Sequence, residues 1–234
     1  MNLQQVRSDG FNAVGMGVAS PAERNRVLRN TYALLALSMV PTVLGAWLGV
    51  ATGLSSMMSG GVGLVAFLVG AFGFMFAIEK TKNSAAGVPV LLAFTFFMGV
   101  MLSRLIGVVL GMGNGAALIA TAFSGTGLIF LGMATMSSVI KRDLSSMGKW
   151  LFIGAVMLLV AGIANFFIQS SALMITLSVL AMGIFSAFIL YDLKRVQDGF
   201  ETNYISATLS VYLSLFNVFQ SLLSLLGIFG SSDE

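Results

Sequence analysis

The chain has 234 residues, of which 57% are hydrophobic and only 9% are charged, and its mean hydropathy is +0.96. A soluble domain has about 25% charged residues, so this composition excludes an ordinary soluble protein. The net charge is +3, and the chain contains neither Cys nor His, which excludes disulfides, zinc clusters and haem bound through histidine. The cations are spread over loop ends, so we expect contacts with lipid headgroups and no nucleic-acid partner.

The chain begins with a polar stretch, which seven long apolar segments follow. Residues 1–25 lack an apolar core and predict a flexible cytoplasmic tail rather than a cleavable signal peptide. Residues 26–230 predict one membrane domain of seven helices, and residues 231–234 a short C-terminal tail. Each apolar segment has about 18–25 residues, enough to cross a hydrocarbon core of about 30 Å. The spans are expected at about 31–51, 58–78, 85–102, 115–136, 149–168, 172–191 and 205–229.

The basic residues alternate between the gaps that separate these segments. Eleven of the twelve Lys and Arg residues lie in the N-terminal tail or in the second, fourth and sixth gaps. The third gap contains only Arg104, and the first and fifth gaps contain none. This alternation follows the positive-inside rule. It predicts an all-α integral membrane protein with its N-terminus in the cytoplasm and its C-terminus outside.

The seventh segment differs from the others because small polar residues recur along it. Their spacings of 4, 4, 3, 4 and 3 place them within a sector of roughly 80°, opposite an apolar sector that includes Tyr212. Such a stripe is not expected to face lipid. Two interpretations remain open: a central helix whose serines form interhelical hydrogen bonds, or the lining of a hydrated path for a small ion. The stripe comprises Ser206, Ser210, Ser214, Asn217, Ser221 and Ser224.

Ionisable residues also stand at the predicted helix ends: Glu79, Arg104, Asp192 and Glu201. Asp192 follows about twenty uncharged residues, which places it at or just inside the cytoplasmic boundary. It is either a buried carboxylate that gates by gaining or losing a proton, or a partner of Lys194 or Arg195 at headgroup level. The first interpretation makes Asp192, Ser214 and Asn217 a candidate ion- or proton-sensing site. No catalytic or firm metal site is predicted, because no nucleophile–base pair or phosphate loop is visible.

Two stretches resemble the Bax inhibitor-1 family of seven-helix membrane proteins. One reads Val-Leu-Arg-Asn-Thr-Tyr at residues 27–32, and the other follows the pattern ETNYIxATxSxYxSLxNxFxSLLSxLG at residues 201–227. The similarity extends from about residue 25 to the C-terminus. The resemblance implies two three-helix layers around a central seventh helix, in the bacterial inner membrane.

The resemblance also implies two activities. The bacterial inner-membrane members that these stretches resemble are substrates and negative regulators of FtsH, the membrane-bound ATP-dependent protease of membrane protein quality control. FtsH is therefore an expected partner, bound through the N-terminal tail. Other members are pH-sensitive calcium leak channels in which two aspartates share a proton. Asp192 matches the first aspartate, but Ser214 occupies the second position. Calcium would be a transient permeant ion, and no other cofactor is implied.

Overall fold

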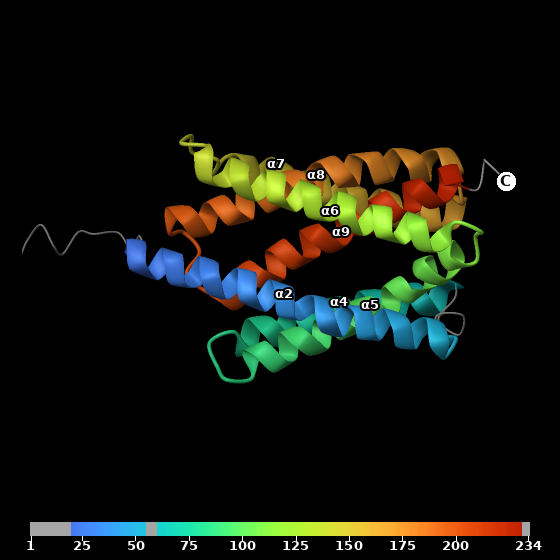
Figure 1. Ribbon diagram of the computed structural model, residues 1–234, viewed down its shortest axis with the longest axis horizontal. Helices are drawn as coiled ribbons and strands as arrows, with labels where there is room; N and C mark the ends of the chain where they lie inside the picture. The colour runs from blue at the N-terminus through green and yellow to red at the C-terminus, as the bar shows by residue number, and fades with distance from the viewer. Residues whose placement is uncertain (1–19, 55–59, 231–234) are drawn as a thin grey trace, which may run out of the picture.

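The computed structural model describes residues 20–54 and 60–230 of the chain. In these ranges it forms seven helices of 22 to 31 residues and no strand, and each helix is long and apolar enough to cross a membrane. The predicted all-α membrane protein with seven spanning helices is therefore confirmed. The helices, shown in Figure 1, are α2 (Pro21–Ala51), α4 (Gly60–Thr81), α5 (Gly87–Leu110), α6 (Gly115–Val139), α7 (Met147–Ile168), α8 (Ser171–Asp198) and α9 (Tyr204–Gly230).

Helix α2 begins ten residues before the predicted start of the first span. The backbone N–H of Glu23 donates to Ser20 Oγ at 3.3 Å, and the Glu23 carboxylate accepts from the Ser20 N–H at 2.8 Å. This capping box, with Pro21 at the first helical position, starts the helix in the polar segment. Residues 21–25, expected in the tail, are therefore helical, and residues 1–19 lie outside the described part of the chain.

Two other helices continue well past their predicted ends. Helix α5 ends at Leu110 and α8 at Asp198, so Arg104 and Asp192 lie inside helices and not at their ends. Helix α8 stops where Gly199 adopts a left-handed conformation (φ 82°) and its N–H bonds to the carbonyls of the last helical turn. The position of this glycine, and not the end of the apolar run, sets the end of α8, which explains why α8 is longer than predicted.

Helices α2 and α5 pack backbone against backbone. A Cβ atom at Gly45 would overlap the carbonyl oxygen of Phe96, and one at Gly99 would overlap the carbonyl oxygen of Thr42. Small residues allow this close approach in membrane helices, where van der Waals packing replaces the hydrophobic effect as the force between helices. We call this contact the α2–α5 seam.

Helix α9 runs between two groups of helices, with α2, α4 and α5 on one side and α6, α7 and α8 on the other (Figure 1). It packs against α2, α4, α5, α6 and α8. Buried residues make up 56% of the α9 span, the largest share among the seven helices. Both of its faces are covered, since Tyr212 and Leu223 on one side and Ser214 and Ser221 on the other are buried.

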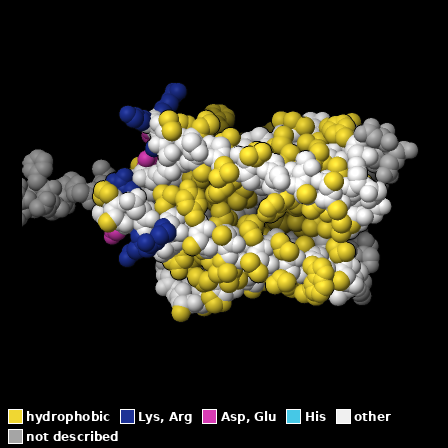
Figure 2. Space-filling model, viewed as in Figure 1, with side chains coloured by type: hydrophobic (Ala, Val, Ile, Leu, Met, Phe, Trp, Pro, Cys, Tyr) yellow, Lys and Arg dark blue, Asp and Glu magenta, His cyan; other side chains and the backbone are white. Residues whose placement is uncertain are grey.

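The charged side chains gather where α2 begins and α8 ends, which we call the charged end; the opposite end is the uncharged end. Figure 2 shows Lys, Arg and acidic side chains at the charged end only, on the face in view. Of the described cations, only Arg104 lies on the other half of the bundle. The positive-inside rule predicts that the charged end faces the cytoplasm.

Candidate functional site

Asp192 is a buried carboxylate in the last two turns of α8, with 9% of its surface exposed. Neither neighbouring cation pairs with it, contrary to one of the two interpretations above. Lys194 Nζ lies 2.8 Å from Asp198 Oδ1, and an Arg195 guanidinium nitrogen lies 4.0 Å from a Glu201 carboxylate oxygen. Within the described residues, no hydrogen bond or ion pair reaches the Asp192 carboxylate. A largely buried carboxylate without such a partner is costly, which marks Asp192 as a candidate functional group.

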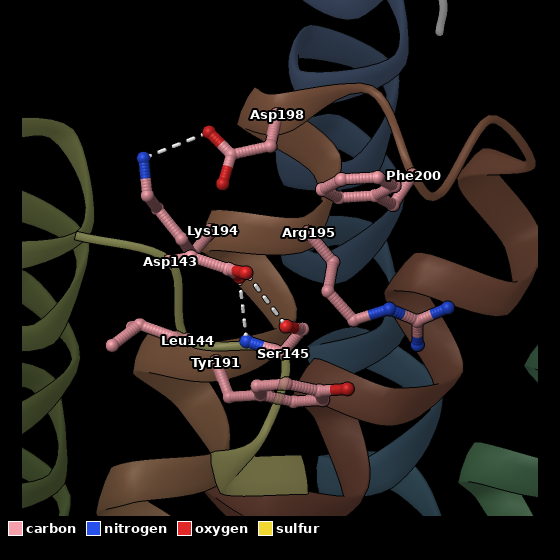
Figure 3. Close-up of a pocket in the computed structure, with 8 residues that line it drawn as sticks. All are labelled: Asp143, Leu144, Ser145, Tyr191, Lys194, Arg195, Asp198 and Phe200. Carbon is pink, nitrogen blue, oxygen red and sulfur yellow. Dashed lines mark hydrogen bonds and ion pairs between the residues drawn. The ribbon is translucent and has the colours of Figure 1, made fainter. Parts of the chain in front are cut away.

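A pocket of about 340 Å³ opens at the charged end, between the α6–α7 connection and the end of α8 (Figure 3). Asp143 accepts hydrogen bonds of 2.8 Å from the backbone N–H and from the hydroxyl of Ser145. These two bonds, with the nearby charge of Lys194, hold the pKa of Asp143 below its ordinary value. Arg195 lies over the ring of Tyr191 at 5.7 Å. Cations and carboxylates therefore balance in this pocket.

The stripe of α9 is only partly buried. Ser214, Ser221 and Ser224 are buried, whereas Ser206, Ser210 and Asn217 are half-buried. Asn217 donates to the carbonyl of Leu213 in its own helix, at 2.8 Å. Among the hydrogen bonds of the described residues, none joins a stripe serine to another helix. In this part of the chain the stripe serines therefore pack without the interhelical hydrogen bonds of the first interpretation.

Asp192 and Ser214 lie on neighbouring antiparallel helices, about one helical turn apart in depth. Asp192 stands six residues before the end of α8, and Ser214 ten residues after the start of α9. At about 1.5 Å per residue these positions lie about 9 and about 15 Å from the charged end. Helical side chains lean toward the N-terminus of their own helix, so the two side chains lean toward each other's level. Ser210, about 9 Å from the same end, is level with Asp192.

The polar contacts between α9 and α2 come from two residues that the stripe does not include. The hydroxyl of Tyr212 lies 2.9 Å from Thr42 Oγ1, and Thr208 Oγ1 donates to the carbonyl of Thr31 at 3.4 Å. Tyr212, which the periodicity places in the apolar sector, is 1% exposed. The sequence could have indicated this contact, because a tyrosine within a membrane span needs a partner for its hydroxyl.

Asn203, which is not among the predicted site residues, joins two connections at the charged end. Its Oδ1 accepts from the N–H groups of Ile205 and Ser206 at 2.9 and 3.1 Å, which caps the start of α9. Its Nδ2 donates to the carbonyl of Lys82 at 3.1 Å and to Asn83 Oδ1 at 2.8 Å. An Asn directly before a helix is a cap signal. Its bonds to Lys82 and Asn83 depend on which loop lies beside it in the fold, which the sequence does not show.

The fold and the enclosed α9 define a multi-pass, seven-helix integral membrane protein. The sequence model of the family described as "Inhibitor of apoptosis-promoting Bax1" matches residues 24–231. The chain belongs to this family, the Bax inhibitor-1 family, as its sequence predicts.

Several bacterial proteins are similar to the chain over most of its length. An "Uncharacterized membrane protein" of Vibrio cholerae is 38% identical over 90% of this chain and 93% of its own length. The "Modulator of FtsH protease YccA" of Escherichia coli K12 is 39% identical over 89% of this chain and 92% of its own. The protein of E. coli O6:H1 that matches equally well is called "Inner membrane protein YccA". The chain is thus a YccA-like, multi-pass protein of the bacterial inner membrane.

Proposed function

We propose that the protein is a substrate and negative regulator of an FtsH-type membrane-bound, ATP-dependent protease. The observation that carries the proposal is its 39% identity, across 92% of the relative's length, to a protein named as a modulator of FtsH. The role is regulatory and not enzymatic: the protein occupies the protease and is itself degraded slowly.

The α2–α5 seam supports this role physically. A protease that pulls on the N-terminal segment must first extract α2, which follows that segment directly. The backbones of α2 and α5 are in contact at Gly45 and Gly99, so α2 cannot leave without opening the seam. Slow extraction would keep the protease engaged and unavailable to other substrates.

Deleting residues 2–19 tests whether the N-terminal segment is the handle. The deletion leaves Ser20 and Glu23 in place, so the capping box of α2 is retained. We expect degradation by purified FtsH with ATP in proteoliposomes to slow several-fold, while the seven-helix domain stays folded.

The control replaces residues 2–19 by a Gly/Ser segment of equal length. It separates the loss of a particular sequence from the loss of length. Equal degradation rates for the truncated and the full-length protein would contradict this use of the tail. A second membrane substrate, degraded as fast with the full-length protein present as without it, would contradict the regulatory role.

A second candidate function, a pH-sensitive cation leak, is favoured by the burial of Asp192, which forms no ion pair with any described residue. Calcium would pass beside the half-buried side of the α9 stripe, and Asp192 would control its passage. We expect calcium entry into liposomes that contain the protein to change at least severalfold on Asp192→Asn. Flux equal to that of empty liposomes between about pH 6 and 8 would remove this function.

A further inference from the structure

Helices α4, α5, α7 and α9 line a crevice of about 250 Å³ toward the uncharged end. Its walls are apolar, with aromatic rings contributed by Phe67, Phe166 and Phe216. Its polar side chains are Arg104 of α5 and Gln220 of α9, and both are exposed. The crevice therefore joins an apolar body to a small polar centre, and it brings both groups of helices and the central helix to one site.

Arg104 has no opposite charge near it within the described ranges 20–54 and 60–230. All six described carboxylates lie in the elements and loops of the charged end, and no ion pair of the described residues includes Arg104. Arg104 stands six residues before the end of α5, about 9 Å along the helix axis. A guanidinium at this depth is costly unless its long side chain reaches the headgroups or an anion comes to it.

We propose that the crevice binds an anionic phospholipid from the leaflet at the uncharged end. The guanidinium of Arg104 would hold the phosphate through its planar array of N–H donors, and the Gln220 amide would supply a further donor. The acyl chains would lie along the apolar walls beside Phe67 and Phe216. The occupant must be amphipathic, because the site offers one cation inside an otherwise apolar crevice.

Lipid binding of this kind would stabilise the packing of α9. Gln220 belongs to the central helix and Arg104 to α5, so a phosphate held by both would join the two elements across the crevice. The bound lipid would then raise the stability of the folded bundle by mass action.

The test uses the purified full-length chain in a neutral detergent, with phosphatidylglycerol as the anionic probe and phosphatidylethanolamine as the zwitterionic one. Native mass spectrometry measures binding, and thermal unfolding measures stabilisation. We expect phosphatidylglycerol to bind and to raise the Tm, and Arg104→Gln to weaken its binding about tenfold, the size of effect expected when a charge-assisted phosphate contact is lost. Gln220→Leu should weaken binding by less.

Lys149→Gln is the matched control, because it removes an exposed cation at the charged end, away from the crevice. It should leave phosphatidylglycerol binding unchanged. Equal losses in Arg104→Gln and Lys149→Gln, or no loss in either, would overturn the proposal. So would competition by inorganic phosphate at the concentrations that phosphatidylglycerol requires, since it would indicate a small-anion site. If Arg104→Gln does not fold, Arg104→Lys replaces it; Lys keeps the charge without the planar donors, and unchanged binding would overturn the role of the guanidinium.

Discussion

The two helix pairs α2–α5 and α7–α8 use glycine in different ways. In the α2–α5 seam, Gly45 and Gly99 face carbonyl oxygens of the opposite backbone. On α7, a Cβ added at Gly154 would lie 3.0 Å from the end of the Ile184 side chain of α8. A Cβ added at Gly162 would meet no neighbouring atom within 4 Å. The α7 span is also the least buried of the seven, at 6%. These glycines of the first pair therefore meet backbone atoms, whereas those of the second that have a close neighbour meet side chains, as Gly148 does at Tyr191.

The contrast shows that glycine content alone does not report how tightly helices pack in a membrane. All twenty-seven glycines allow close approach, yet only some of them meet another backbone. A carbonyl oxygen cannot move aside without moving its helix, whereas the end of an isoleucine can change rotamer. Substitutions at chosen glycines should separate the two kinds of contact.

The largest effect is expected for Gly99→Ala in the seam. Its Cβ would overlap the carbonyl oxygen of Thr42, which is part of the α2 backbone. We expect the free energy of unfolding to fall by about 2–4 kcal/mol, because the two helices must separate to make room. Unfolding in mixed SDS micelles, followed by circular dichroism, measures this loss.

The matched control is Gly107→Ala, two turns further along α5, where nothing lies within 4 Å of the added Cβ. Its stability should stay within about 0.5 kcal/mol of the wild type or rise slightly, since alanine favours helix. If both variants lose the same unfolding free energy, glycine acts in α5 through helix propensity, and the backbone contact of the seam has no special role. In the FtsH assay, Gly99→Ala should also be degraded faster than Gly107→Ala.

A smaller effect is expected where the seam joins the central helix, at the hydrogen bond between Tyr212 and Thr42. Tyr212→Phe removes a buried hydroxyl that forms a hydrogen bond of 2.9 Å with Thr42 Oγ1. Thr42 keeps its bond to the carbonyl of Ser38 at 2.8 Å, while the carbonyl of Thr95 loses a longer bond from the same hydroxyl, at 3.4 Å. We expect a loss of about 1 kcal/mol. A double-mutant cycle with Thr42→Val should give a coupling of about 0.6 kcal/mol, and additive losses would show that the bond contributes nothing.

The smallest effect is expected for Gly162→Ala on α7, where the added Cβ meets open space. Unfolding free energy should change by less than about 0.5 kcal/mol. Gly154→Ala provides the sharper comparison within the same helix, since Ile184 must shift by a few tenths of an ångström. A loss at Gly154 as large as that at Gly99 would show that α7 is held as tightly as α2.

The sequence predicted the seven spans, and its alternating charges indicated one charged end, because both follow from the cost of placing polar groups in hydrocarbon. That cost acts on each segment alone and needs no knowledge of its neighbours. Helix ends were predicted less well, since local signals override hydropathy there. The Ser20–Glu23 capping box lengthens α2 at its start, and Gly199 sets the end of α8 beyond Asp192.

Tertiary structure alone decided which polar residues of α9 reach another helix. The periodicity identified a stripe of serines, but Thr208 and Tyr212 form the contacts with α2. Likewise, the crevice around Arg104 and Gln220 joins residues from separate helices. Such contacts depend on the rotation and crossing of whole helices, which packing determines and which no single segment encodes.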